Sequence, residues 1–92
     1  MVVERVITIK NKQGLHARPA ALFVQIANKY SSEITVAKGK QKVNGKSIMG
    51  IMMLEAGSGS KVILTANGDD AEQAVKELEA LLSSDDIEES VI

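Results

Sequence analysis

Residues 61–82 read KVILTANGDDAEQAVKELEALL and pass from the pattern of a strand to the pattern of a helix. Over residues 61–66 apolar and polar side chains alternate, which predicts a strand with one buried face, and Asn67-Gly68 predicts a turn after it. We expect Asp70 to be the N-cap of the following helix, with Gln73 completing a capping-box-like arrangement. The apolar residues of that helix recur at amphipathic spacing: Ala71, Ala74, Val75, Leu78, Leu81 and Leu82.

Working outward from this stretch, the same reasoning predicts the order β-α-β-β-α-β-α. Four strands joined by turns and amphipathic helices indicate an α+β fold, with a single sheet covered on one face. The remaining elements are a strand over residues 2–9, a helix over 17–29, strands over 33–37 and 40–43, and a short apolar helix over 47–54. Ser47 is expected to cap this second helix.

The composition limits the available chemistry. With 92 residues the chain forms one domain, which we expect over residues 1–84, followed by an acidic tail over residues 85–92. Cysteine is absent and His16 is the single histidine, so we expect no disulfide, no metal site and no cofactor. No apolar run approaches the roughly 18 residues that cross a membrane, and the first residues do not resemble a signal peptide. We therefore expect a soluble cytoplasmic protein with no membrane insertion.

The net charge of -1 conceals an asymmetry along the chain. Residues 1–68 carry ten basic and three acidic side chains, whereas residues 69–92 carry one basic and nine acidic side chains. The positive field of the first part favours an anionic ligand or an acidic partner surface. We expect no nucleic-acid partner, because aromatic residues for base stacking make up only 2% of the chain.

The segment GLHARPA, residues 14–20, carries the most informative chemical signal. It places His16 where a loop meets a helix, and the free backbone N–H groups of a helix N-terminus form an anion site. If the imidazole takes up a phosphoryl group, these N–H groups and Arg18 stabilise the added negative charge. Gly14 permits a close backbone approach or a positive φ just before the histidine. On position and composition alone, His16 is equally well an incidental histidine at the start of a helix.

Two motifs together resemble a known family. GLHARPA (residues 14–20) looks like the active-site signature of the histidine-containing phosphocarrier HPr of the bacterial phosphotransferase system. VNGKSIMGIMML (residues 43–54) resembles the second signature of that family, around its regulatory serine. The resemblance covers about residues 1–83, and the two motifs have the separation that the family uses. It implies an open-faced β-sandwich, in which three helices cover one face of a four-stranded antiparallel sheet.

The resemblance also implies roles for individual residues. His16 matches the histidine that accepts a phosphoryl group from phosphorylated enzyme I on its δ1 nitrogen and passes it to sugar-specific IIA components. Arg18 matches the arginine beside that histidine, whose guanidinium suits a phosphoryl group in transfer. In this scheme the protein is a stoichiometric carrier and not an enzyme, and its partners supply most of the transfer machinery.

Ser47 has two compatible interpretations. Its local role is to cap a short helix, and a phosphoserine is also electrostatically favourable at a helix N-terminus. In Gram-positive relatives this serine is modified by a dedicated kinase and phosphatase. The modification slows transfer at the histidine and creates a co-repressor for a catabolite-control regulator. The sequence contains a competent site and does not show that it is used.

The second helix has too many apolar residues to bury all of them. We assign Ile51 and Leu54 to the core and expect some of the others to stay exposed and form an apolar patch near His16, because methionine surfaces adapt to several partners. In the family, the corresponding surface docks enzyme I and the IIA proteins. The expected docking residues are Ala21, Leu22, Ile48, Met49 and Met52.

Three alternatives to a sugar-system carrier stay open. The first is a carrier in a nitrogen-related or regulatory branch, which no residue distinguishes from the sugar branch. The second is a regulatory binding protein that acts through Ser47, although the known regulatory relatives lack the histidine that this chain has at position 16. The third is a small binding domain with an incidental histidine. We expect a monomer, because a carrier needs His16 exposed.

Overall fold

A computed structural model describes residues 1–84 of the chain, and the predicted acidic tail over residues 85–92 lies outside the described residues. All seven predicted elements are present in the predicted order. They are β1 (Val2–Thr8), α1 (Ala17–Ala27), β2 (Glu33–Lys38), β3 (Gln41–Asn44), α2 (Ile48–Met53), β4 (Lys61–Asn67) and α3 (Ala71–Leu82).

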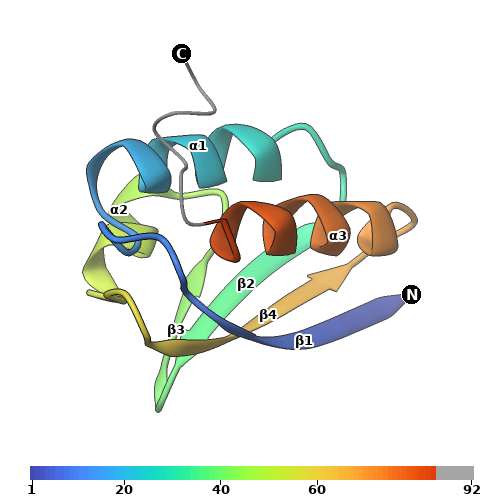
Figure 1. Ribbon diagram of the computed structural model, residues 1–92. Coiled ribbons are helices and arrows are strands. Elements are labelled where there is room, and N and C mark those ends of the chain that lie inside the picture. The colour runs from blue at the N-terminus through green and yellow to red at the C-terminus, as the bar shows by residue number, and fades with distance from the viewer. Residues whose placement is uncertain (85–92) are drawn as a thin grey trace.

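The four strands form one antiparallel sheet in the order β1-β4-β2-β3. The three helices lie on the same side of the sheet, with α1 and α3 next to each other and α2 near one end (Figure 1). This arrangement confirms the predicted α+β class and the open-faced β-sandwich. No helix in the described part of the chain is long and apolar enough to cross a membrane.

The core lies between the sheet and the helices. In β4, Val62, Leu64 and Ala66 point inward, as the alternation of residues 61–66 predicts. The apolar face of α3 packs against them, although Leu81 is only half-buried at the rim of the core. From α1, Phe23 is the largest fully buried side chain. The strand and helix patterns of the sequence therefore meet in one continuous core.

The predicted capping box at the start of α3 is wrong. Asp70 occupies the N-cap position, but its side chain makes no capping hydrogen bond. Its carboxylate instead accepts hydrogen bonds from the backbone N–H groups of Ser31 at 2.9 Å and Ser32 at 3.0 Å, and from both serine hydroxyls. These donors, led by the Ser32 hydroxyl, lower the pKa of Asp70 from 3.8 to about 2. Four donors from the loop before β2 outcompete the single N–H group that a local cap would satisfy.

The end of α1 also differs from the prediction, because the helix ends at Ala27 and not at residue 29. The Asn28 side-chain amide donates a hydrogen bond of 2.9 Å to the carbonyl oxygen of Val24, which also accepts the backbone N–H of Asn28 at the C-cap. The chain then turns toward the sheet, and Lys29 and Tyr30 reach α3.

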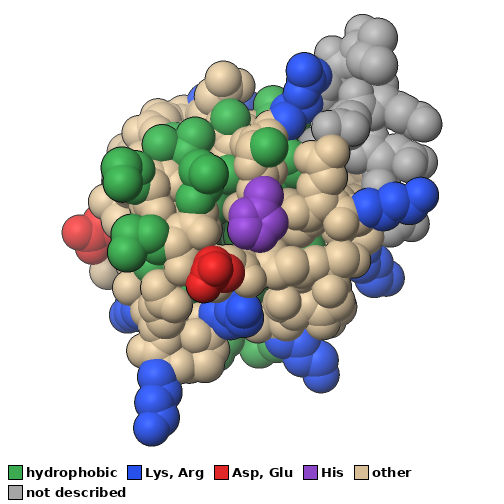
Figure 2. Space-filling model, turned by 90° about the vertical axis from the view of Figure 1, so that its left-hand side faces the viewer, with side chains coloured by type: hydrophobic (Ala, Val, Ile, Leu, Met, Phe, Trp, Pro, Cys, Tyr) green, Lys and Arg blue, Asp and Glu red, His purple; other side chains and the backbone are tan. Residues whose placement is uncertain are grey.

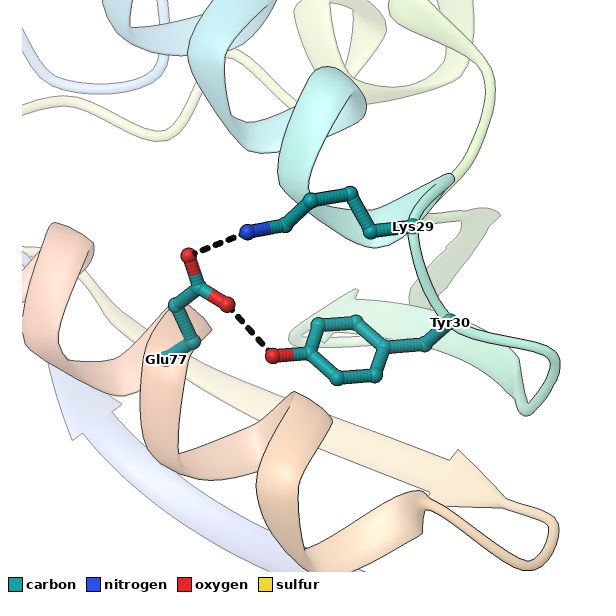
Figure 3. A network of polar contacts seen from close by, with 3 residues as sticks. All are labelled: Lys29, Tyr30 and Glu77. Carbon is teal, nitrogen blue, oxygen red and sulfur yellow. Dashed lines mark hydrogen bonds and ion pairs between the residues drawn. The ribbon is translucent and has the colours of Figure 1, made fainter.

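Figure 3 shows how these two residues join α1 to α3: both side chains converge on the carboxylate of Glu77. Lys29 Nζ lies 2.8 Å from Glu77 Oε2, and the Tyr30 hydroxyl donates to Glu77 Oε1. The hydrogen bond from Lys29, followed by that from Tyr30, lowers the pKa of Glu77. The same carboxylate, first through its hydrogen bond, raises the pKa of Tyr30 above 10.0. The contact fixes the position of α1, the helix that begins at His16.

Candidate functional site

His16 lies at the N-cap position of α1, with an extended backbone (φ -125°, ψ 158°). Its side chain is exposed and makes no capping hydrogen bond to the helix. Figure 2 shows this single histidine near the centre of one face, with hydrophobic side chains gathered to its left, an acidic side chain directly below it and basic side chains farther out. The imidazole is therefore open to a reaction partner that approaches this face.

The start of α1 presents backbone donors beside the imidazole. Its first turn contains no acidic residue, and the side chain of its N-cap residue, His16, makes no capping hydrogen bond. Ala17 and Arg18 carry the first backbone N–H groups of the helix, and Pro19, which is buried in the first turn, has none to satisfy. Arg18 is exposed in the same turn. Backbone N–H groups, the positive end of the helix dipole and a guanidinium together suit an anion bound at His16.

The backbone next to His16 is strained. Ala17 has a φ of 50°, which places an ordinary side chain in the left-handed region at the first helical residue. For a residue with a Cβ atom this conformation costs about 1–2 kcal/mol. The helix that follows and the anchored loop that precedes it hold the residue in this conformation.

Gly14 and Leu15 anchor that loop. Leu15 is fully buried, and its N–H donates a hydrogen bond of 2.8 Å to the carbonyl oxygen of Ala56. Gly14 has a φ of 65°, and a Cβ atom there would lie 2.5 Å from the Ala56 oxygen and 2.7 Å from the Cα atom of Gly57. Both reasons for a glycine that the sequence suggests, a positive φ and a close backbone approach, are therefore present. The position of His16 depends on the segment that follows α2.

Basic side chains lie on both sides of His16 in the sequence. Lys10 and Lys12 are exposed in the preceding loop, and Arg18 follows in the helix. The N–H of Lys10 donates to the carbonyl oxygen of Leu82 at 3.0 Å, which ties the start of this loop to the end of α3. The charged side chains that flank His16 along the chain are therefore basic, as the charge asymmetry of the sequence indicates.

Ser47 is the N-cap of α2, as the sequence predicts. Its hydroxyl oxygen accepts a hydrogen bond of 3.1 Å from the N–H of Gly50, and the residue is half-buried. The N–H of Ser47 donates to the carbonyl oxygen of Asn44 at 3.2 Å, within the turn that leaves β3. The capping role is therefore present in the structure, and the regulatory role stays a prediction.

The structure divides the apolar residues of α2 as the sequence predicts. Ile51 and Leu54 are buried in the core, and Ile48, Met49 and Met52 are exposed. On α1, Ala21 and Leu22 are half-buried, and α1 packs against α2. The predicted docking residues thus lie on two adjoining helices, on the helix that begins at His16 and on the one beside it.

Sequence reasoning missed Met53 and the residues that fix the end of α2. Met53 is exposed, and together with Met49, Met52 and Glu55 it lines a groove of about 480 Å³. The exposure of Met53 could have been predicted from the helical periodicity, because burial of residues 51 and 54 directs residue 53 outward. The side chains of Lys38 and Gln41 donate to the carbonyl oxygens of Glu55 at 3.0 Å and Met53 at 3.2 Å. No sequence signal identifies these two contacts, which depend on how β2 and β3 meet the helix.

Metal binding has no candidate site in the described part of the chain. No group of three or more His, Cys, Asp or Glu side chains among residues 1–84 is arranged to hold an ion.

Comparison with known sequences gives one consistent answer. Residues 3–84 match the family model described as "PTS HPr component phosphorylation site". The HPr-like protein Crh of Halalkalibacterium halodurans is 49% identical over 84 residues, which are 91% of this chain and 100% of that protein. The phosphocarrier protein HPr of Borreliella burgdorferi is 43% identical over 90% of this chain and 96% of its own length. The phosphocarrier protein NPr of Shewanella violacea is 39% identical over 89% of this chain and 90% of its own length.

Solved structures agree with the sequences. HPr of Bacillus anthracis superimposes with a TM-score of 0.87 at 46% identity, covering 89% of this chain and 98% of the other. HPr of Thermoanaerobacter tengcongensis does so with a TM-score of 0.85 at 60% identity, over 87% and 90% of the two chains. A second structure from that organism, described as an HPr dimer, has a TM-score of 0.69 at 63% identity over 82% and 86% of the chains. The expected monomer is thus not confirmed.

Proposed function

This chain belongs to the HPr family of the phosphotransferase system, and from this premise we propose that it carries phosphoryl groups on His16. The observation that carries the proposal is the placement of an exposed imidazole at the N-cap position of α1, where it makes no capping hydrogen bond to the helix. The family is one of phosphocarriers and not of catalysts. The carrier therefore turns over no small substrate by itself, and its donor and acceptor are other proteins.

The transfer exchanges one bond to phosphorus for another. The lone pair of His16 Nδ1 attacks the phosphorus atom carried by phosphorylated enzyme I, and the bond between phosphorus and the donor breaks. In the second half of the cycle a histidine of a IIA component attacks the same phosphorus atom. The bond to Nδ1 then breaks, and His16 returns to its starting state.

Arg18 and the start of α1 stabilise the phosphorylated form. The phosphoryl group brings negative charge to a position beside the N–H groups of Ala17 and Arg18. The exposed guanidinium of Arg18 is long enough to contact the phosphoryl oxygens on the protein surface. We expect Arg18→Met to slow transfer while leaving the fold intact.

The partners dock on the surface formed by α1 and α2. The exposed apolar residues of α2 can bind a partner protein and hold it close to the reactive histidine. Basic residues near this surface attract acidic partner surfaces. The docking residues are Ala21, Leu22, Ile48, Met49 and Met52. Docking in this position brings the donor phosphorus to His16.

Ser47 supplies regulation on the same surface. A serine kinase and phosphatase would add and remove charge at the start of α2, next to Ile48 and Met49. Ser47→Asp keeps an acceptor for the Gly50 N–H but adds negative charge, so it should slow uptake from phosphorylated enzyme I. Ser47→Ala removes the cap without adding charge, so it should cost about 1 kcal/mol of stability and affect uptake less. Equal rates for the two variants would argue against charge as the cause.

The branch in which the carrier works is a further part of the proposal. We place it in sugar transport, in the cytoplasm where phosphoenolpyruvate charges enzyme I. The relatives named NPr and Crh support the alternatives, a nitrogen-related carrier or a catabolite-control regulator. His16 favours a carrier over a purely regulatory protein. A panel of purified IIA components from sugar and nitrogen branches would identify the acceptor by transfer of labelled phosphate.

The domain boundaries are part of the proposal as well. We place the carrier domain at residues 1–84 and the acidic tail at residues 85–92.

The proposed quaternary state is a monomer, because docking on α1 and α2 needs an uncovered face. Light scattering at working concentration tests the monomer. A dimer that takes up no phosphate until it dissociates would support the need for a free face. A dimer that takes up phosphate at full rate would contradict it.

Intact mass tests the central claim. The protein is incubated with phosphoenolpyruvate and a heterologous enzyme I, and a parallel sample is treated with acid. We expect a gain of one phosphate that acid removes, and no gain in His16→Ala. A full acid-labile gain in His16→Ala would refute the assignment of the site, and no gain in the wild type with two different enzymes I would refute the carrier.

A further inference from the structure

The sulfur atoms of this protein are concentrated on one helix. The chain has four methionines and no cysteine. Apart from Met1, all of them, Met49, Met52 and Met53, lie in α2. The other apolar positions of the chain are filled by residues that peroxides do not readily oxidise. A mild oxidant therefore meets the protein mainly at α2 and at its first residue.

All three thioethers of α2 are accessible. Met49 is 70%, Met53 62% and Met52 44% exposed. The buried residues Ile51 and Leu54 fix the phase of the helix, so rotation cannot bring these methionines under cover. Together they form most of the lining of the groove of about 480 Å³. A small oxidant in water can reach each sulfur without any unfolding.

We propose that Met49, Met52 and Met53 form a reversible oxidation site that controls partner docking on α2. This inference rests on the proposed function, because it assigns a regulatory role to the docking surface. Hydrogen peroxide is the oxidant. The thioether sulfur takes one oxygen atom as the O–O bond breaks, sulfur loses two electrons, and water is released. Thiol-dependent methionine sulfoxide reductases reverse the step and release the oxygen as water.

Oxidation changes the surface in the direction that weakens docking. A thioether is an apolar, flexible contact, whereas a sulfoxide is polar and strongly accepts hydrogen bonds. Burying a sulfoxide against an apolar partner removes water from its oxygen without replacing the lost hydrogen bonds, which costs binding free energy. Burying one methionine side chain contributes about enough transfer free energy for a tenfold change in an equilibrium constant. We therefore expect oxidation to raise the KM for the docking partner about tenfold, with a much smaller effect on kcat.

The fold should survive this modification. Methionine oxidation disrupts proteins mainly when the side chain is buried, and here the core contacts of α2 are made by Ile51 and Leu54. Both ends of the helix are held by polar contacts that contain no sulfur. Ser47 caps the first turn, and Lys38 and Gln41 bind the last carbonyl groups. The change is thus confined to the surface, as a reversible switch requires.

The test compares each protein with its own untreated sample. The wild type and the triple variant Met49→Leu, Met52→Leu, Met53→Leu are treated with limiting hydrogen peroxide, and oxidised positions are mapped by peptide mass. Met1 is 69% exposed and present in both proteins, so its oxidation serves as an internal control. The measured quantity is the KM for the carrier in phosphoryl uptake from phosphorylated enzyme I, before and after oxidation. Thermal unfolding of both samples reports on the fold.

We expect the KM of the wild type to rise about tenfold, the ratio for the leucine variant to stay near one, and sulfoxide reductases to restore the wild type. An unchanged KM after full oxidation of all three residues would overturn the inference alone. An equal rise in the leucine variant, or a rise caused by unfolding, would also overturn it. Absence of uptake in the untreated wild type would instead overturn the proposed function, and the inference with it.

Discussion

Lys46 Nζ donates a hydrogen bond of 2.7 Å to the backbone carbonyl oxygen of Tyr30. The contact joins the turn before α2 to the segment just after α1, and Asn28 reinforces it by donating to the Lys46 carbonyl oxygen at 3.4 Å. Tyr30 in turn reaches α3 through Glu77. The helix that carries the histidine and the helix that carries the docking surface are therefore fixed to one another and to α3.

Replacing Lys46 by methionine tests this connection. Lys46→Met keeps a long apolar stem but leaves the Tyr30 carbonyl without its donor, so we expect a loss of about 1 kcal/mol. For a chain of this size that loss corresponds to a fall in Tm of about 4–8 °C. Lys42→Met, at an exposed position on β3, is the matched control and should leave the Tm nearly unchanged. Equal effects of the two substitutions would show that the contact contributes nothing specific.

Gly14 and Gly39 offer a matched pair for the loop that positions His16. Both have a positive φ, 65° and 60°, but only at Gly14 would a Cβ atom meet the backbone of residues 56 and 57. Gly39→Ala should cost about 1–2 kcal/mol through backbone strain alone. Gly14→Ala should cost more than that and should also slow phosphoryl uptake, because the loop must move. Urea unfolding and the uptake assay measure the two effects, and equal stabilities of the variants would contradict the packing argument.

Tyr30 permits a direct optical test of the contact between α1 and α3. It is the only tyrosine, and the chain has no tryptophan, so phenolate absorbance reports on this residue alone. The hydrogen bond to Glu77, together with burial and the negative charge of that carboxylate, raises the pKa of Tyr30 above 10.0. Glu77→Gln keeps an acceptor but removes the charge, so the absorbance midpoint should fall toward 10.0. Glu79→Gln, which removes the partner of Arg5 instead, should leave the midpoint in place.

Asp70 predicts how stability depends on acid. Its carboxyl pKa lies at about 2 in the folded chain and at 3.8 in the absence of the serine donors. The unfolded chain therefore binds the proton more readily. The stabilisation is fully present above pH 3.8 and is lost as the pH falls toward about 2. Urea midpoints over this range should decline less steeply in Asp70→Asn than in the wild type, and Asp69→Asn, at the neighbouring exposed position, should follow the wild type.

Most of the fold follows from local patterns in the sequence. The alternation in β4 and the amphipathic spacing in α3 each arise because one face of the element is buried. The pattern of residues is therefore enough to predict this strand and this helix. The N-cap of α2 is local as well, because Ser47 and Gly50 are three residues apart. The capping prediction for Asp70 was wrong because a distant partner competes with the local one: Asp70 binds Ser31 and Ser32 from another part of the chain. The end of α1 was misplaced by two residues although the contact there is local, between Asn28 and Val24.

The candidate site divides in the same way. The sequence alone determined that a histidine stands at the start of a helix after Gly14, with Arg18 in its first turn, because spacing along the chain sets these relations. Only the tertiary structure decided that the segment after α2 anchors the histidine loop and that Lys38 and Gln41 hold the end of the docking helix. It also decided that every internal methionine is exposed on one face. Contacts between residues far apart in sequence depend on how sheet and helices pack, and no local periodicity encodes that packing.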